Sequence, residues 1–175
     1  SGIDYKRTIS AAATLGKRGG ASTITQQLAK ALLEHQRKKS KAFTGIQKIK
    51  EWIIAIKLER NFTKEEIIAL YLNAVPYGDN IYGIRNATRT FFQKEPDRVS
   101  IEEAALLIGL LKGNNIYNPR RNPKAALDRR NVVLNQMAKN AKISEAEAAK
   151  LKAKEIKLNY NKMDENRGYA PYFRE

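Results

Sequence analysis

Apolar side chains recur every three or four residues along most of this chain, which is the spacing of amphipathic α-helices. The pattern predicts helices over residues 3–15, 23–33, 43–60, 63–73, 84–92, 100–111, 123–139 and 144–153. Four predicted starts carry a hydroxyl followed three residues later by Glu or Gln, the capping-box spacing: Thr23, Thr63, Ser100 and Ser144. No strand-rich segment and no internal repeat is visible in the sequence, so we expect an all-α fold.

Two of these helices carry specific expectations about burial. In the helix that begins at Ser22 or Thr23, one apolar stripe recurs every four residues and consists of Ile24, Leu28 and Leu32. The helix over residues 43–60 has two apolar faces, one formed by Ile46, Ile49, Ile53 and Ile56 and the other by Ile54, Ala55 and Leu58. Beyond Trp52 this helix is apolar almost all round, so we expect it to be buried.

Glu51 stands at the end of an apolar stripe of the same helix rather than among solvated charges. Lys48 lies one turn before it and Gln47 lies four residues before it, so both are within reach on a helix. A half-buried carboxylate beside a lysine is a candidate functional group. The alternative is a surface ion pair worth about 0.2–1 kcal/mol, and the spacing leaves both interpretations open.

The segment from Gly19 to Lys30 concentrates two glycines, three hydroxyls, two adjacent amides and a lysine in twelve residues. Glycine permits close approach of the backbone to a ligand. The first N–H groups of the following helix lie at the positive end of its dipole. These features suit a bound anion or sugar phosphate, and the alternative is an ordinary glycine turn before a well-capped helix.

Composition narrows the possible partners. The 175 residues suffice for one compact domain, and 42% hydrophobic content is typical of a globular protein. The formal net charge of +15 favours polyanionic partners, namely nucleic acid, an anionic membrane surface or a diphosphate substrate. The absence of cysteine excludes disulfides and thiolate metal sites.

The sequence shows neither a signal peptide nor a membrane span. The longest apolar run, Ala104 to Leu111, is far shorter than the roughly 20 residues that a span requires. Because the chain opens inside a helical pattern without methionine, we expect it to be part of a longer protein whose anchor lies upstream.

The segment GGASTITQQLAK at residues 19–30 resembles the second motif of the peptidoglycan glycosyltransferases (glycosyltransferase family 51), found in bifunctional penicillin-binding proteins and in monofunctional transglycosylases. Further stretches match the family in the same order. QKIKE at 47–51 resembles the third motif, R-K-x-x-E, and KEEIIALYLN at 64–73 is similar to the fourth. The later matching segments are residues 82–84, 102–110, 117–123 and 129–134, with 169–173 resembling a linker into a transpeptidase domain.

Two departures from the family pattern matter. The first motif, E-D-x-x-F-x-x-H-x-G, is represented only by Ser1-Gly2, so the glutamate that serves the family as general base is absent from this chain. Gln47 replaces the arginine of the third motif, which removes one expected cationic contact.

The resemblance implies polymerisation of lipid II into β-1,4 glycan strands, with inversion and release of polyprenyl diphosphate. It implies that Glu51 is the second catalytic carboxylate and organises cations around the diphosphate. The residues that it implies in substrate binding are Ser22, Thr23, Gln27, Lys30, Gln47, Lys48 and Lys112. No tightly bound cofactor or metal is expected, although a divalent cation (Mg or Mn) could accompany the substrate diphosphate.

The resemblance also implies a lysozyme-like all-α fold with a smaller membrane-facing lobe. The region 31–46 would lie near that lobe, and the alternative for this region is a solvated mobile loop. The glycosyltransferase domain would cover residues 1–160, and residues 161–175 would begin a linker to a covalently attached transpeptidase domain. The implied partners are lipid II, the growing glycan chain, the membrane surface and moenomycin-type inhibitors, with no nucleic acid. The implied location is the extracytoplasmic face of the bacterial cytoplasmic membrane.

Two alternatives remain at this stage. A basic helical nucleic-acid-binding module would explain the charge, with Arg120-Arg121 and Arg129-Arg130 tracking phosphates. It leaves the ordered motifs unexplained, however, and no known nucleic-acid-binding motif is present. Alternatively, the chain binds the lipid substrate or its inhibitors without turnover, because the general-base glutamate is missing.

Overall fold

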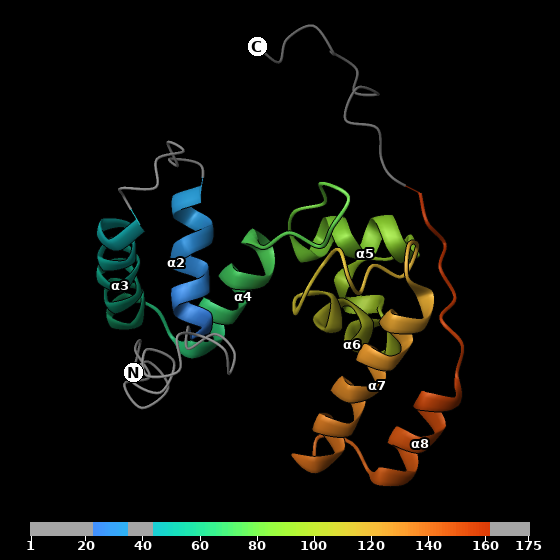
Figure 1. The fold of residues 1–175 in the computed structure, drawn as a ribbon. Coiled ribbons are helices and arrows are strands. Elements are labelled where there is room, and N and C mark those ends of the chain that lie inside the picture. Colours follow the sequence, from blue (N-terminus) through green and yellow to red (C-terminus); the bar gives the residue numbers. More distant parts are fainter. Residues whose placement is uncertain (1–22, 35–43, 162–175) are drawn as a thin grey trace, which may run out of the picture. The chain divides into compact units, whose positions relative to one another are not determined.

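The computed structural model describes residues 23–34 and 44–161, and this part of the chain is helical without strands (Figure 1). The helices are α2 (Ile24–Glu34), α3 (Thr44–Asn61), α4 (Lys64–Ala74), α5 (Ile84–Phe92), α6 (Ile101–Leu110), α7 (Pro123–Lys139) and α8 (Glu145–Ala153), with a 3₁₀ turn η2 (Pro96–Arg98). The all-α prediction is confirmed, and the helix bounds agree with the sequence pattern to within one or two residues. The helix predicted over residues 3–15 lies outside the described residues.

The contacts between residues divide the chain into two compact units, Ser1–Val75 and Pro76–Glu175. In the first unit, α2 packs against both α3 and α4. In the second unit, α7 packs against α6 and α8. Each unit buries its own apolar side chains, and each is considered separately below.

The predicted stripe on α2 is only partly correct. Leu28 and its neighbour Ala29 are buried, but Ile24 and Leu32 are 47% and 51% exposed. Both exposed residues lie in the terminal turns of α2, whereas the buried ones lie in its middle, where α3 and α4 can cover them.

The expectation that α3 is buried on all sides is wrong. Glu51, Ala55 and Leu58 are buried, whereas Ile49, Ile53 and Ile56 are 55%, 49% and 41% exposed. Each set has the i, i+4, i+7 spacing, and at about 100° per residue the two sets lie on opposite sides of the helix. The buried set marks the packed face of α3, and the isoleucines therefore form a separate outer stripe.

The second unit is centred on the packing of α6, α7 and α8. Ala105, Leu134 and Leu151, one from each helix, form a buried cluster. Gly109 allows α6 to approach α7 closely, because a Cβ at this position would lie 3.2 Å from Cγ of Arg129. Phe91 and Phe92 are buried at the end of α5.

The turn between α4 and α5 is fastened by a buried carboxylate. Gly78, Asp79 and Asn80 all have positive φ, as their residue types, which are typical of turns, favour. The Asp79 side chain is only 6% exposed and pairs with Arg120 and Arg121. Burial alone would raise the pKa of Asp79, but the Asn118 hydrogen bond and the two arginine charges outweigh it and lower the pKa.

The arginines that the nucleic-acid alternative requires make contacts within this unit. Arg120 and Arg121 both pair with Asp79. Arg130 is 1% exposed, and it donates to the Asn131 side chain and the Lys152 carbonyl. Arg129 lies over the Tyr117 ring, so each of the four arginines has a structural partner within this unit, and nothing in the described residues favours the nucleic-acid alternative.

The last described residues, 154–161, form a segment that we call the C-terminal strap. Its backbone forms neither helix nor strand from residue 155 onward, and it is bound to the end of α5. Asn159 N–H donates to the Phe91 carbonyl and Asn161 N–H donates to the Thr90 carbonyl, each over 2.9 Å. The proposed domain boundary at residue 160 stays a prediction, and residues 162–175 lie outside the described part.

Candidate functional site

The start of α2 has the reciprocal capping predicted from its sequence. The Thr23 backbone N–H donates to Oε1 of Gln26, and the Gln26 backbone N–H donates to Oγ1 of Thr23, each over 3.2 Å. This arrangement fixes the first turn of the helix that carries Gln27 and Lys30. The positive end of the helix dipole is therefore held at a defined place in the first unit.

Gln27 is exposed on α2, and its side chain contacts α4. The Tyr71 hydroxyl donates to Oε1 of Gln27 over 3.1 Å. Tyr71 itself is buried, with 8% exposure, and burial raises the pKa of its hydroxyl. The hydroxyl is therefore protonated at neutral pH, and it fixes one end of the Gln27 amide.

Glu51 and Lys48 form the ion pair expected from their spacing on α3. Nζ of Lys48 lies 2.6 Å from Oε2 of Glu51, and the Glu51 side chain is 11% exposed against 44% for Lys48. The carboxylate is thus buried on the packed face of α3, which lies against α2. A buried charge is costly unless paired, and the geometry differs from the fully exposed pair considered as the alternative.

A second polar contact joins α2 to α3 beside a pocket of the first unit. Oγ1 of Thr25 donates to Oε1 of Glu59 over 2.8 Å. The pocket has a volume of about 400 Å³, and its lining residues are Ile24, Thr25, Glu59, Phe62, Lys64, Ile67 and Ile68. Its lining is mixed, with apolar side chains beside the acidic Glu59 and the cationic Lys64. None of the predicted substrate-binding residues whose side chains the structure describes lines it.

The remaining predicted site residues do not all lie in one unit of the described structure. Lys30 is exposed on α2, in the same unit as the Lys48–Glu51 pair. Ser22 lies outside the described residues, and of Gln47 only the helical backbone is described. Lys112 is exposed directly after α6, in the second unit. The structure places Thr23 at the start of α2, Gln27 and Lys30 along α2, and Lys48 and Glu51 on the adjoining α3. The contact between Thr25 and Glu59 puts the start of α2 beside the end of α3, about 12 Å along the helix axis from Glu51, so Thr23 does not lie at the Lys48–Glu51 pair.

Sequence reasoning missed Tyr71 as part of this arrangement. The residue lies in the fourth-motif segment, where it reads as one of several apolar core positions. Its i, i+4 spacing from the buried Ile67 signals burial, but nothing in the sequence reveals which residue its hydroxyl meets 44 positions earlier.

The described residues hold no group of three or more His, Asp or Glu side chains that could bind a metal ion. The single histidine, His35, lies outside that range. The described helices also include none that is both long and apolar enough to cross a membrane.

Comparisons with known proteins agree in pointing to one family. The sequence profile of a family described as Transglycosylase matches residues 1–138. The chain is 37% identical to penicillin-binding protein 2D of Bacillus subtilis over 98% of its own length and 25% of the relative's. It is 36% identical to penicillin-binding protein 1A of Escherichia coli over 89% of its length and 18% of the relative's.

A solved structure shows the same fold. The crystal structure of penicillin-binding protein 1A from Haemophilus influenzae matches 77% of this chain and 17% of that chain, with 28% identity and a TM-score of 0.53. The chain thus spans a quarter or less of the length of these relatives.

Proposed function

This chain belongs to the transglycosylase family and is a peptidoglycan glycosyltransferase domain of the kind found in penicillin-binding proteins, and on that basis we propose that it polymerises lipid II into β-1,4 glycan strands. The observation that supports assigning this activity to particular residues is the buried Glu51 carboxylate. It is paired with Lys48 on a helix that packs against the capped α2.

The reaction makes two demands on the site: first a base, and second fixed positive charge. The 4-hydroxyl of the incoming lipid II sugar attacks the anomeric carbon of the growing chain, and the bond from that carbon to the diphosphate breaks with inversion. A base accepts the hydroxyl proton, which contributes about 10²- to 10⁴-fold in rate. Fixed positive charge stabilises the departing polyprenyl diphosphate.

We assign the second demand, fixed positive charge for the departing diphosphate, to residues of the first unit. Lys48 and Lys30 supply charge to the diphosphate, and Glu51 orients Lys48 through the 2.6 Å contact. Thr23 and Gln27 bind sugar or phosphate oxygens, together with Ser22 and Gln47. The substrate-binding role that the resemblance implies for Lys112, which lies in the second unit, stays a prediction.

The family resemblance assigns the first demand to the glutamate of the first motif, which the given sequence does not contain. We therefore propose that the chain as given binds substrate but is inactive in turnover. Any Mg or Mn ion would arrive with the substrate diphosphate, since Glu51 is a single carboxylate without further clustered ligands among the described residues.

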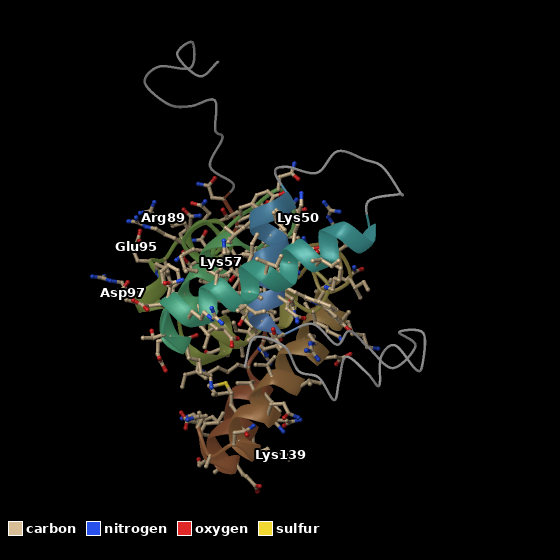
Figure 2. All side chains as sticks on the ribbon, turned by 90° about the vertical axis from the view of Figure 1, so that its left-hand side faces the viewer. Lys50, Lys57, Arg89, Glu95, Asp97 and Lys139 are labelled. Atoms are coloured by element: carbon tan, nitrogen blue, oxygen red, sulfur yellow. The ribbon has the colours of Figure 1, made fainter. Side chains whose placement is uncertain are left out.

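The outer stripe of α3 supports a membrane-facing role for the first unit. Ile49, Ile53 and Ile56 are exposed along one side of the helix. Lys50 and Lys57 lie along the same helix (Figure 2), at positions where their ammonium groups can reach lipid headgroups while the stripe contacts acyl chains. This arrangement fits an enzyme at the extracytoplasmic face of the bacterial cytoplasmic membrane. Moenomycin-type inhibitors would occupy the substrate site, and a transpeptidase domain would follow in the same protein.

The test compares this chain with a chain extended upstream through the first motif, in a lipid II polymerisation assay. We expect glycan strands only from the extended chain, and binding of lipid II by both. Equal polymerisation by both chains would transfer the role of base to another residue, with Glu51 first in line. Failure of both chains to polymerise or bind lipid II would overturn the proposal.

A further inference from the structure

The contact between Tyr71 and Gln27 fixes which way an exposed amide points. The terminal torsion of a glutamine side chain is broad, and its oxygen and nitrogen can exchange places at little cost. Here Oε1 of Gln27 accepts a hydrogen bond from the Tyr71 hydroxyl over 3.1 Å. With the oxygen held toward α4, the amide nitrogen and its two N–H donors are the part of Gln27 left to face a ligand.

Tyr71 is well suited to hold this amide still. Its ring is buried on α4, the helix that packs against α2, and a tyrosine has only two side-chain torsions to immobilise. The hydroxyl remains a donor throughout the neutral range, because burial raises the pKa of Tyr71. The buried ring thus anchors a donor at the edge of the site.

We propose that Tyr71 is a positioning residue for substrate binding, which holds the Gln27 amide with its N–H groups directed at an acceptor oxygen of the lipid-linked substrate. The inference rests on the proposed function. It adds which partner donates in the hydrogen bond between Gln27 and the substrate. Gln27 donates to a phosphate, carbonyl or sugar oxygen through the N–H groups that the Tyr71 contact leaves directed away from α4.

A double-mutant cycle tests the inference in the extended chain that carries the first motif. The variants are Tyr71→Phe, Gln27→Ala and the double substitution, with kcat, KM for lipid II and the melting temperature measured for each. One lost hydrogen bond corresponds to about a 2- to 10-fold rise in KM. We expect this rise for Tyr71→Phe with kcat little changed, and no further rise when Tyr71→Phe is added to Gln27→Ala.

Two additional variants separate positioning from structure. Thr25→Val removes the other hydrogen bond described between α2 and a neighbouring helix, so it should lower the melting temperature comparably while leaving KM unchanged. Gln27→Glu can still accept from Tyr71 but presents no N–H, so it should raise KM at least as much as Tyr71→Phe. An unchanged KM for Gln27→Glu would overturn the proposed direction of recognition.

The outcomes distinguish the inference from the function on which it rests. If the extended wild-type chain does not polymerise lipid II, the proposed function fails and the inference fails with it. If it polymerises and Gln27→Ala raises KM, but Tyr71→Phe does not, the function stands and the positioning role is overturned. An equal effect of Tyr71→Phe with and without Gln27 would likewise overturn it, because the tyrosine would then act through the fold alone.

Discussion

Buried charges in this protein are each compensated in a different way. Glu51 has a single lysine partner on its own helix, whereas Asp79 has two arginines from a distant loop. Arg130 donates to neutral oxygens of Asn131 and Lys152. The doubly paired Asp79 serves to fasten a turn. The lysine of the Glu51 pair is 44% exposed, so this pair lies at the surface end of the packed face of α3.

We predict that Glu51→Gln in the extended chain abolishes polymerisation while the fold stays intact, because the amide cannot organise cations around the diphosphate. The measurements are glycan strand formation and the melting temperature. Glu59→Gln is the matched control, since it makes the same change about two turns later on α3 and can still accept from Thr25. Polymerisation by Glu51→Gln at the control's rate would contradict the assignment.

Side-chain contacts within one helix could be predicted from the sequence, whereas contacts between helices could not. The pairing of Lys48 with Glu51 could be predicted because both lie on one helix, three positions apart. The contact between Tyr71 and Gln27 could not, because it depends on how α4 packs against α2. Helical periodicity shows which side of a helix is apolar, but it does not show which residue of another helix lies opposite.

At the scale of elements, α3 is a helix with two distinct apolar faces. The sequence shows both faces, but periodicity alone does not say which one a neighbour covers. The structure places Ala55 and Leu58 on the packed face and leaves Ile49, Ile53 and Ile56 on the outer one. Helix starts were more predictable, because capping boxes at Thr23 and Thr63 are local and both are present.

The two faces of α3 predict opposite effects of substitution. Ile53→Asn should leave the melting temperature nearly unchanged and weaken binding to anionic vesicles, because the outer stripe would lose apolar contact with lipid. Leu58→Ala should lower stability by about 2–4 kcal/mol through loss of buried side-chain contacts, with vesicle binding retained below its melting temperature. Thermal unfolding and vesicle sedimentation check both. A loss of stability in Ile53→Asn equal to that in Leu58→Ala would show that the outer stripe is covered.

At the scale of the whole molecule, the titration of carboxylates sets the response to acid. The pKa of Glu66 is lowered by the Thr63 backbone N–H and hydroxyl, and the pKa of Glu95 is lowered chiefly by its hydrogen bond from Arg89. Figure 2 shows Arg89 and Glu95 close together. Together with Asp79, these groups bind protons more weakly in the folded chain than in the unfolded one.

We therefore predict that stability falls as the pH drops below about 4. A group whose folded pKa is lowered contributes stability that is fully present above its unfolded pKa, about 3.9 for Asp. That contribution is lost as the pH falls through the folded pKa. Asp79→Asn should unfold at a lower temperature at pH 7 and show a shallower decline in melting temperature between about pH 4 and pH 2. A decline as steep as that of the wild type would exclude Asp79 as a contributor.

The C-terminal strap determines how mechanical tension would enter the second unit. Because Asn159 and Asn161 are hydrogen bonded to the last turn of α5, a pull on the chain beyond Asn161 loads α5 before it reaches α8. The Tyr160 ring, with its centroid 5.5 Å from that of Phe91, bears on the same helix. Because Arg120, in the loop between α6 and α7, lies over the Tyr160 ring at 4.1 Å, part of the load would also reach that loop before it reaches α8.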